Sequence, residues 1–330
     1  MAPTEITVEA GSREVRLTHP DRVLFPKQGW TKLDVAEHYL LCAEGAVRGT
    51  YRRPCSLKRW PQGVASPFFF TKRAPAGMRQ SVPVVFPSGR PGQMAIVEDV
   101  SDIIDQVQLG CIDLNPWASR AGSLDHPDEL RLDLDPTEGF GFDHCRKVAA
   151  ACRTLLEEQG LVGWPKTSGS RGIHVYVRAK PQWTFDQVRR AGLAFAREIE
   201  RRLPGLATTA WWKEERRGVF IDYNQNALDR SVAGAYSLRH TGLVSTPFSW
   251  DEVDTIDPTV MTLPGFRQRW QAIGDLTEGI DEAAGDLSGL LSMSAADEEQ
   301  GLGDAPWPPM YPKHPGEPPR VQPSKRRRPT

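Results

Sequence analysis

The sequence predicts an α/β protein of the mixed α+β kind, with two sub-sheets that meet at a group of acidic residues. Segments that alternate like β-strands are interspersed with segments of helical periodicity, but without the regular strand-helix-strand spacing of a doubly wound sheet. Single acids also interrupt strongly apolar stretches at positions 133, 135 and 222. Because an isolated buried charge is costly, these acids are expected to share a partner where the sub-sheets meet.

The first third of the chain is expected to contain short strands and one capped helix. Residues 13–30 have the pattern of a short strand and a turn. A helix is predicted to begin at Thr31, because Asp34 stands three residues later in an Asp version of the capping box. Residues 55–120 are rich in proline and glycine and are predicted to be strand-like.

The middle of the chain is predicted to alternate between strands and longer helices. A strand is expected at residues 131–136, and Asp143 is a candidate cap for the helix that follows it. Thr184 and Gln187 form a second capping box in front of an amphipathic segment. The chain shows no internal repeat.

Composition excludes several classes of protein. The 330 residues carry 41 basic and 42 acidic side chains, so the chain is not a wholly basic DNA-coating protein, although a local basic groove is compatible with this balance. No apolar run reaches the length of a membrane span, and the N-terminus has no signal-peptide pattern. The five cysteines show no CxxC spacing, which favours free thiols in a cytoplasmic protein without a membrane partner.

The run Arg-Leu-Asp-Leu-Asp at 131–135 is the strongest indication of chemistry. Residues two apart on a strand share a face, so Leu132 and Leu134 are expected in the core. Asp133 and Asp135 then project together from the other face. Adjacent carboxylates repel each other, and a divalent metal such as Mg²⁺ or Mn²⁺ removes that penalty. The alternative is an ordinary pair of acids at a strand end.

Two further segments favour a metal-phosphate enzyme. Residues 168–177, Ser-Gly-Ser-Arg-Gly-Ile-His-Val-Tyr-Val, begin with a glycine-rich loop whose backbone amides could approach an anion, and continue as a strand. Asp222 interrupts the apolar run at 219–223, where an acid is usually paired or bound to a metal. Three acids and a basic, hydroxyl-bearing loop are the components of phosphoryl or nucleotidyl transfer.

These motifs resemble those of the archaeo-eukaryotic primase superfamily, and more closely the polymerase domain of bacterial ligase D and its stand-alone primase-polymerase relatives. The resemblance extends over about residues 10–290. It implies an archaeo-eukaryotic primase-like catalytic core in which Asp133, Asp135 and Asp222 are catalytic and bind two Mn²⁺ or Mg²⁺ ions. It also implies a nucleotide-binding set of Lys58, Ser168, Ser170, Arg171, His174, Gln225 and Arg239.

The resemblance also implies contacts with DNA. Arg22 and Lys32 occupy the places of two basic residues that form a 5′-phosphate pocket in this family. Lys32 falls in the first turn of the capped helix, where free N–H groups and the helix dipole favour an anion. Phe69 and Phe70 match a pair that stacks on template bases. On a strand, Phe69 would point to the face opposite that of Phe68 and Phe70. Packing against a single core therefore does not explain all three rings.

Three features depart from the ligase D pattern. Asn115 stands where the family usually has a histidine, and an asparagine cannot act as a base at neutral pH. No Lys-x-Asp-Gly ligase motif occurs. The segment 241–243 is shorter than usual, which predicts a different rim for the nucleotide pocket.

The expected organisation is a primase-polymerase catalytic domain over residues 1–300, followed by a tail. Within the domain, residues 1–120 would carry the 5′-phosphate-binding elements and residues 121–300 the catalytic core. Residues 301–330 are rich in proline and end in a basic run, so they are predicted to be a disordered tail.

The predicted function is that of a DNA polymerase or primase that fills short gaps bearing a 5′-phosphate, in end joining or excision repair. Its substrates would be NTPs or dNTPs and gapped or broken DNA. A DNA ligase and Ku are candidate partners of what is expected to be a cytoplasmic, nucleoid-associated bacterial monomer. Two alternatives stay open: a module that binds or bridges DNA ends with little catalysis, and a metal-dependent glycosyltransferase, which explains the Asp-x-Asp pair but not Asp222.

Overall fold

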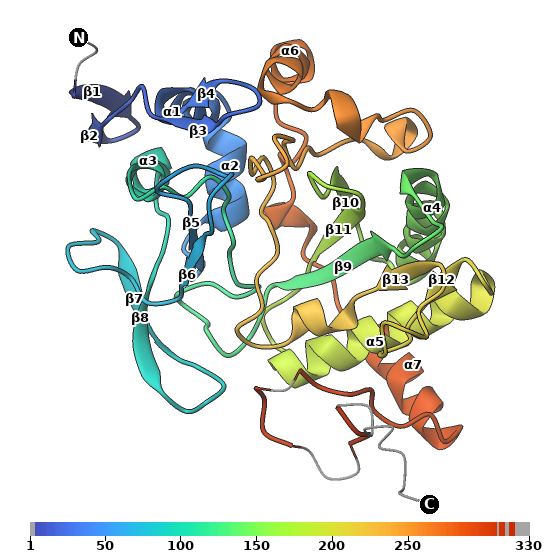
Figure 1. Cartoon of the computed structure of the whole chain (residues 1–330). Coiled ribbons are helices and arrows are strands. Elements are labelled where there is room, and N and C mark those ends of the chain that lie inside the picture. Colours follow the sequence, from blue (N-terminus) through green and yellow to red (C-terminus); the bar gives the residue numbers. More distant parts are fainter. Residues whose placement is uncertain (1–3, 309, 314–316, 321–330) are drawn as a thin grey trace, which may run out of the picture.

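The computed structural model describes residues 4–308, 310–313 and 317–320 (Figure 1). Within these residues, the N-terminal half consists of antiparallel two-stranded ribbons with helices packed among them. The ribbons are β1 (Glu5–Ala10) with β2 (Arg13–Thr18), β3 (Val23–Phe25) with β4 (Trp30–Thr31), β5 (Leu57–Arg59) with β6 (Phe69–Thr71), and β7 (Ser81–Val85) with β8 (Pro91–Ala95). The helices are α1 (Lys32–Leu41), α2 (Ala43–Thr50) and α3 (Val100–Gln108).

A five-stranded sheet with the order β10-β11-β9-β13-β12 dominates the C-terminal half of the described chain. Neighbouring strands are antiparallel except β12 and β13. The strands are β9 (Glu129–Pro136), β10 (Gly163–Thr167), β11 (Ile173–Arg178), β12 (Ala207–Thr208) and β13 (Val219–Ile221). The helices are α4 (Phe142–Glu158), α5 (Phe185–Arg202), α6 (Leu263–Ile273) and α7 (Ser288–Glu299), with 3-10 turns η1 (Tyr223–Asn226), η2 (Trp250–Glu252), η3 (Pro258–Val260) and η4 (Asp281–Ala283).

The central strand β9 separates an apolar face from a polar one. Leu130, Leu132 and Leu134 point into a core that they build with α4 and α5. Asp133 and Asp135 belong to the opposite face, as the alternation predicts. Burying each leucine contributes about 2 kcal/mol, and a shift by one residue would move the acids into the core, so the register of β9 is strongly specified.

The predicted mixed α/β class is confirmed, but the acids lie on one face of the five-stranded sheet. The strands outside this sheet form two-stranded ribbons in the described chain, not a second sub-sheet of similar size. Residues 55–120, predicted to be strand-like, also contain α3. Asp99 and Asp102 form the capping box of this helix, a signal that the surrounding prolines and glycines obscure.

The start of α4 differs by two residues from the prediction. The N-cap is Gly141, and Asp143 already lies inside the first turn. Its carboxylate forms an ion pair with Arg146 on the same helix instead of capping the backbone. The capping box predicted at Thr184 and Gln187 is confirmed at the start of α5.

The N-terminal and C-terminal halves share a hydrophobic core. Leu24 and Tyr39 from the N-terminal half belong to the same cluster as Tyr236, Leu238 and Phe266. Residue 120 therefore does not separate two independent cores. The two parts of the predicted domain have to fold together.

The structure differs from the predicted disordered tail at residues 301–308. Trp307 is 3% exposed, and Asp304 forms an ion pair with Arg189 of α5. Specific contacts therefore hold this part of the predicted tail on the domain despite its proline content. The basic run 325–328 lies outside the described residues.

Two expectations from composition can be compared with the structure. All five cysteines are buried free thiols, in agreement with the absence of CxxC spacing. In the part of the chain that the structure describes, no helix has the length and apolar character needed to cross a membrane.

Candidate active site

Two acids of β9 and one acid that follows β13 lie side by side. Asp133 and Asp135 project from the polar face of β9, and Asp222 comes directly after β13, the neighbouring strand. The backbone N–H of Asp222 donates to the carbonyl oxygen of Asp133 at 2.9 Å. The sheet register thus brings together the three acids that the sequence singles out.

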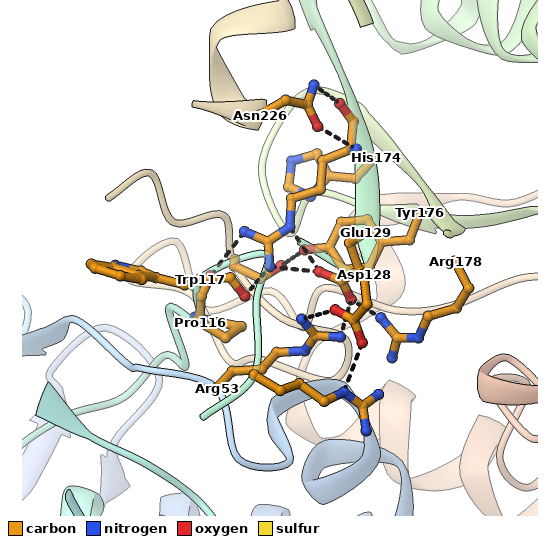
Figure 2. Close-up of polar contacts among 12 residues, drawn as sticks. Arg53, Pro116, Trp117, Asp128, Glu129, His174, Tyr176, Arg178 and Asn226 are labelled. Atoms are coloured by element: carbon orange, nitrogen blue, oxygen red, sulfur yellow. Dashed lines mark hydrogen bonds and ion pairs between the residues drawn. The ribbon is translucent and has the colours of Figure 1, made fainter. Parts of the chain in front are cut away.

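The turn after Asp222 is fixed to β9 by Asn226, as Figure 2 shows. The Asn226 side chain accepts from the backbone N–H of Arg131 at 2.7 Å and donates to its carbonyl oxygen at 2.9 Å. Within the turn, the two oxygens of Asp222 accept from the backbone N–H of Asn224 and from Nε2 of Gln225, each at 3.0 Å. The turn therefore sets the position of Asp222 relative to β9.

A buried ion-pair network anchors the beginning of β9 (Figure 2). Glu129 is fully buried and pairs with the guanidinium groups of Arg53, Arg131 and Arg178. Burial alone would raise the pKa of Glu129, but the three cations lower it well below its usual range. Arg53 comes from the N-terminal half, so the network also joins this half to β9.

Burial raises the pKa of all three acids, and the charge of Asp133 adds to the rise at Asp135 and Asp222. Burial raises the pKa of Asp133 to about 6. Burial, with the charge of Asp133 as a second cause, raises the pKa of Asp222 to about 6. The pKa of Asp135 rises to about 7, first because of the charge of Asp133 and then because of burial. The three buried carboxylates therefore resist ionisation, and a bound cation would relieve this cost.

The chemistry of the three acids suits a divalent metal ion, although their donor atoms do not converge on one point in this structure. Oδ1 of Asp133 is buried and accepts no hydrogen bond, with Nε2 of His174 as a neighbour at 3.3 Å, and an unpaired buried acceptor is costly. Carboxylate oxygens are ligands that Mg²⁺ and Mn²⁺ prefer. Among the described residues, no three acids, histidines or cysteines already gather their donor atoms around one point. Both oxygens of Asp222 are engaged by donors of their own turn.

A polar cleft of about 250 Å³ opens in front of Asp133 and Asp135. Asn115 and the segment 231–233 form part of its lining, and no sequence motif indicates that segment. Five members of the predicted nucleotide-binding set complete the lining: Ser168, Ser170, His174, Gln225 and Arg239. The structure therefore brings most of this set together with two of the three acids.

The loop at residues 168–172 is shaped by Ser168 and Gly172. Oγ of Ser168 accepts from the backbone N–H groups of Ser170 at 3.1 Å and Gly172 at 3.0 Å. Gly172 cannot carry a side chain, because a Cβ atom there would lie 2.2 Å from the carbonyl oxygen of Leu134. Ser168 therefore organises the loop as well as lining the cleft.

Lys166 fixes the imidazole ring of His174. Its Nζ lies 2.7 Å from Nδ1 of His174 and donates to Oγ of Ser245 at 2.6 Å, while Nε2 of the ring lies 3.3 Å from Oδ1 of Asp133. Burial, and then the charge of Lys166, lower the pKa of His174 well below its usual value, so the ring is neutral at pH 7. Nζ can donate to Nδ1, which leaves the ring proton to Nε2, the nitrogen nearest Asp133. No sequence motif indicates Lys166. It lies next to His174 because β10 pairs with β11, so only the strand pairing could have revealed it.

Arg239 forms an ion pair at the cleft with Asp113, a buried acid that is not among the predicted site residues. Nε of Arg239 lies 3.6 Å from Oδ2 of Asp113, and Nη1 donates to the carbonyl oxygen of Ser168 at 2.9 Å. The side-chain amide of Asn115 donates to Oδ1 of Asp113 at 3.0 Å. Asn115, at the place of the family's histidine, therefore supports the acid that orients Arg239.

The other two members of the predicted nucleotide-binding set lie beside the cleft. Nζ of Lys58 lies over the rings of Trp60 and Phe68, 4.6 Å from each centroid. Burial is the main cause of a lowered pKa at Lys58. Arg171 is exposed outside the cleft lining, and its charge opposes the rise in the pKa of Asp135. The charge of Lys58 acts on Asp113, and that of Arg171 acts on Asp135.

The model of the LigD primase-polymerase domain family matches residues 31–277. The chain belongs to this family. A multifunctional non-homologous end joining protein LigD from Pseudomonas aeruginosa is 30% identical over 282 residues, which cover 84% of this chain and 32% of that protein. The multifunctional non-homologous end joining DNA repair protein LigD of Mycobacterium tuberculosis is 32% identical over 292 residues, which cover 83% of this chain and 38% of that protein.

A solved structure of a LigD polymerase domain is similar over the same region. The polymerase domain from Mycobacterium tuberculosis ligase D in complex with DNA gives a TM-score of 0.75 at 31% identity, over 82% of this chain and 99% of that chain. The chain thus spans about a third of the length of the curated relatives it matches. The predicted ligase D resemblance and mixed α/β core are confirmed, and the family is one of metal-dependent nucleotidyltransferases.

In this LigD-like chain, Arg22 and Lys32 meet where β3 and β4 pair. The backbone N–H of Lys32 donates to the carbonyl oxygen of Arg22 at 2.9 Å. Burial, and then the charge of Arg22, lower the pKa of Lys32. Nζ of Lys32 donates to the carbonyl of Thr18 and Nη1 of Arg22 to that of Pro61, both at 2.8 Å. Within the described chain, no salt bridge to an acid neutralises either cation. Lys32 is only 5% exposed, and its Nζ also lies 3.4 Å from Oε1 of Gln108.

The start of α1 does not offer the free N–H groups that the sequence predicts. The capping box of Thr31 and Asp34 is confirmed, and it occupies the N–H of Asp34 at 3.2 Å. The N–H of Leu33 donates to the carbonyl of Pro20 at 2.9 Å, and that of Lys32 is engaged as described above. The preceding loop satisfies these amides, so the prediction of anion binding by helix N–H groups is wrong. Side-chain cations alone form the candidate phosphate site.

Phe69 and Phe70 lie on β6 and are open to solvent. They are 63% and 51% exposed, and Phe68 is 50% exposed, so none of the three rings is a core residue. Phe70 pairs with Lys58 across the β5–β6 ribbon, which places the rings beside a residue of the nucleotide-binding set. Exposed rings at this place are suited to stacking on unpaired bases.

Proposed function

We propose that this chain is a template-dependent nucleotidyltransferase that extends a primer across short DNA gaps bearing a 5′-phosphate. The observation that carries the proposal is one cleft that joins Asp133 and Asp135 to His174 and Arg239. Nucleotidyl transfer needs acids that hold metal ions next to donors that hold a triphosphate. The relatives are end joining proteins, which supports a role in DNA repair by end joining or excision repair.

In the proposed reaction, the 3′-hydroxyl of the primer attacks the α-phosphorus of the incoming nucleotide, and pyrophosphate leaves. Two Mn²⁺ or Mg²⁺ ions, held by Asp133, Asp135 and Asp222, would supply Lewis acidity at the attacking and the leaving oxygens. His174 would donate from Nε2, and Arg239 from its guanidinium, to phosphate oxygens. These donors are already fixed by Lys166 and Asp113 through the contacts described above, so little reorganisation is needed when charge develops.

The DNA would be held by two further groups of residues. Arg22 and Lys32 would bind the 5′-phosphate of the downstream strand, since a dianion between two cations makes charge-assisted hydrogen bonds. Phe69 and Phe70 would stack on template bases, which contributes about 1–3 kcal/mol per base without sequence preference. A glycosyltransferase needs neither group, so both features favour a DNA substrate.

The proposed partners follow from the chemistry of the product. Gap filling leaves a nick, so a DNA ligase is proposed to seal it, and Ku to hold the broken ends. The protein is proposed to act as a monomer. Its substrate would place it in the bacterial cytoplasm at the nucleoid.

Primer extension on gapped duplexes tests the proposal. Wild type and Asp135→Asn are compared in Mn²⁺ with rNTPs and dNTPs in parallel, on gaps carrying a 5′-phosphate or a 5′-hydroxyl. Extension is expected from wild type only, with equal DNA binding by both proteins. DNA binding without any extension by wild type would favour the end-binding module. Turnover of nucleotide sugars without extension would favour a glycosyltransferase.

A further inference from the structure

Residues 302–308, called the strap below, run along α5 and the η1 turn (Figure 1). The first residues of the strap accept hydrogen bonds from Arg197 of α5. Trp307, near its end, is almost completely buried. The strap lies outside the residues that match the family and packs next to the turn that follows Asp222.

Arg189 of α5 is the centre of this contact. Its guanidinium is fully buried. Nη1 donates to Oδ1 of Asp304 at 2.6 Å, and Nη2 donates to the carbonyl of Ala305 at 2.7 Å. The guanidinium carbon lies 4.0 Å from the ring centroid of Trp307 and 5.3 Å from that of Tyr223 in η1. A cation buried to this degree requires such partners, so the strap is what allows Arg189 to remain buried.

Arg189 and the strap both bind Asn224, the residue whose backbone holds Asp222. Nε of Arg189 donates to Oδ1 of Asn224 at 2.7 Å. Nδ2 of Asn224 donates to the carbonyl of Pro306 at 3.2 Å. The backbone N–H of Asn224 donates to Oδ1 of Asp222 at 3.0 Å. Both ends of the Asn224 side-chain amide are therefore fixed, and with them the turn that orients the Asp222 carboxylate.

We propose that the strap is a positioning element of the metal site: through Arg189 and Asn224, it holds Asp222 ready to bind the ion. The inference rests on the proposed function, because it takes Asp222 as a metal ligand. Residues that orient a metal ligand without touching the ion change metal affinity by about 10- to 100-fold when they are removed. The strap would act in this way from a segment that the family's matched region does not contain.

Trp307→Ala in the full-length chain tests the proposal. Binding of Mn²⁺ to the protein, without DNA or nucleotide, is followed by the electron paramagnetic resonance signal of the free ion. We expect binding to weaken about tenfold or more in Trp307→Ala. Trp307→Phe, which keeps a ring over Arg189, should stay within about twofold of wild type. In gap filling, the Mn²⁺ concentration that gives half the maximal rate should rise in Trp307→Ala, while the nucleotide KM at saturating Mn²⁺ stays unchanged.

Arg197→Ala is the matched control, because Arg197 also joins α5 to the strap but forms no hydrogen bond with Asn224 in the described structure. It is expected to lower the unfolding temperature and to leave Mn²⁺ binding unchanged. Equal weakening by Arg197→Ala, or unchanged binding by folded Trp307→Ala, would overturn the proposal. If Trp307→Ala does not fold, Asp304→Asn replaces it with the same expectations, since it removes the charge facing Arg189 at nearly constant volume.

Failure of the proposed function would give a different pattern. Asp222→Asn is expected to lose Mn²⁺ binding; if it binds the ion as wild type does, Asp222 is not a ligand, and the metal assignment and the role of the strap are both wrong. If Asp222→Asn loses binding while Trp307→Ala keeps it, the metal assignment stands and only the role of the strap is refuted.

Discussion

Replacing Asp133 by asparagine is expected to abolish catalysis yet stabilise the metal-free fold above neutral pH. Burial raises the pKa of Asp133 from an ordinary 3.8 to about 6. Between these values the folded protein keeps a proton that the unfolded chain releases, so stability falls as the pH rises through this window. This rise in the pKa of Asp133 destabilises the folded protein by roughly 3 kcal/mol once the pH exceeds 6. Asparagine stays neutral and removes this cost.

Thermal unfolding in EDTA measures the effect. At about pH 8, Asp133→Asn should melt several degrees above wild type, at on the order of 2 °C per kcal/mol for a chain of this size. At about pH 4.5 the gain should be much smaller, because Asp133 is then mostly protonated in folded wild type. Adding Mn²⁺ should raise the melting temperature of wild type but not of the variant, since only a native state that binds the ion is stabilised.

Two results would refute this reasoning. A variant less stable than wild type in EDTA at alkaline pH would show that the Asp133 carboxylate is well stabilised in the fold without a metal. Equal stabilisation of both proteins by Mn²⁺ would remove Asp133 from the metal site. Asp143→Asn, at an exposed position of α4, is the matched control and should change neither measurement.

Lys166→Met is expected to raise the nucleotide KM about tenfold and to leave DNA binding unchanged, because the imidazole loses the hydrogen bond that holds it; steady-state titration on gapped DNA measures this. The double variant Arg22→Ala, Lys32→Ala should lose the preference for 5′-phosphorylated gaps. The salt dependence of its DNA binding should flatten by about one unit of slope per lost phosphate contact. If the preference survives, the 5′-phosphate binds elsewhere. The double variant Phe69→Ala, Phe70→Ala should weaken gap binding by about 1–3 kcal/mol per unstacked base whether or not the 5′-phosphate is present, and equal binding in a competition assay would contradict the stacking role.

The parts of the site that depend on local geometry could be predicted from the sequence. The period of two along a strand is set by the backbone, so the pattern at 131–135 was enough to place Asp133 and Asp135 on the polar face of β9. Likewise, a capping box spans four consecutive residues, and the one at Thr31 and Asp34 is formed as predicted.

The parts that depend on long-range register could not be predicted in this way. Lys166 faces His174 only because β10 pairs with β11, and Asp113 reaches Arg239 from a distant segment. The first-turn amides of α1 are occupied by a loop whose path no local pattern reveals. Disorder was predicted for residues 301–308 because proline-rich segments rarely fold on average, whereas here Trp307 and Asp304 make specific contacts with Arg189.

The ion pairs of Glu129 have a consequence for how such a protein can evolve. Arg53 reaches Glu129 from the other half of the chain, and breaking a buried pair of this kind costs on the order of 3–5 kcal/mol. Loss of residues 1–120 would also uncover Tyr236 and Leu238, whose apolar neighbours lie in that half. The part that would contact DNA ends therefore cannot be exchanged as a module between relatives. New preferences for DNA ends have to arise by substitutions in exposed ribbons such as β5–β6, inside one cooperatively folding unit.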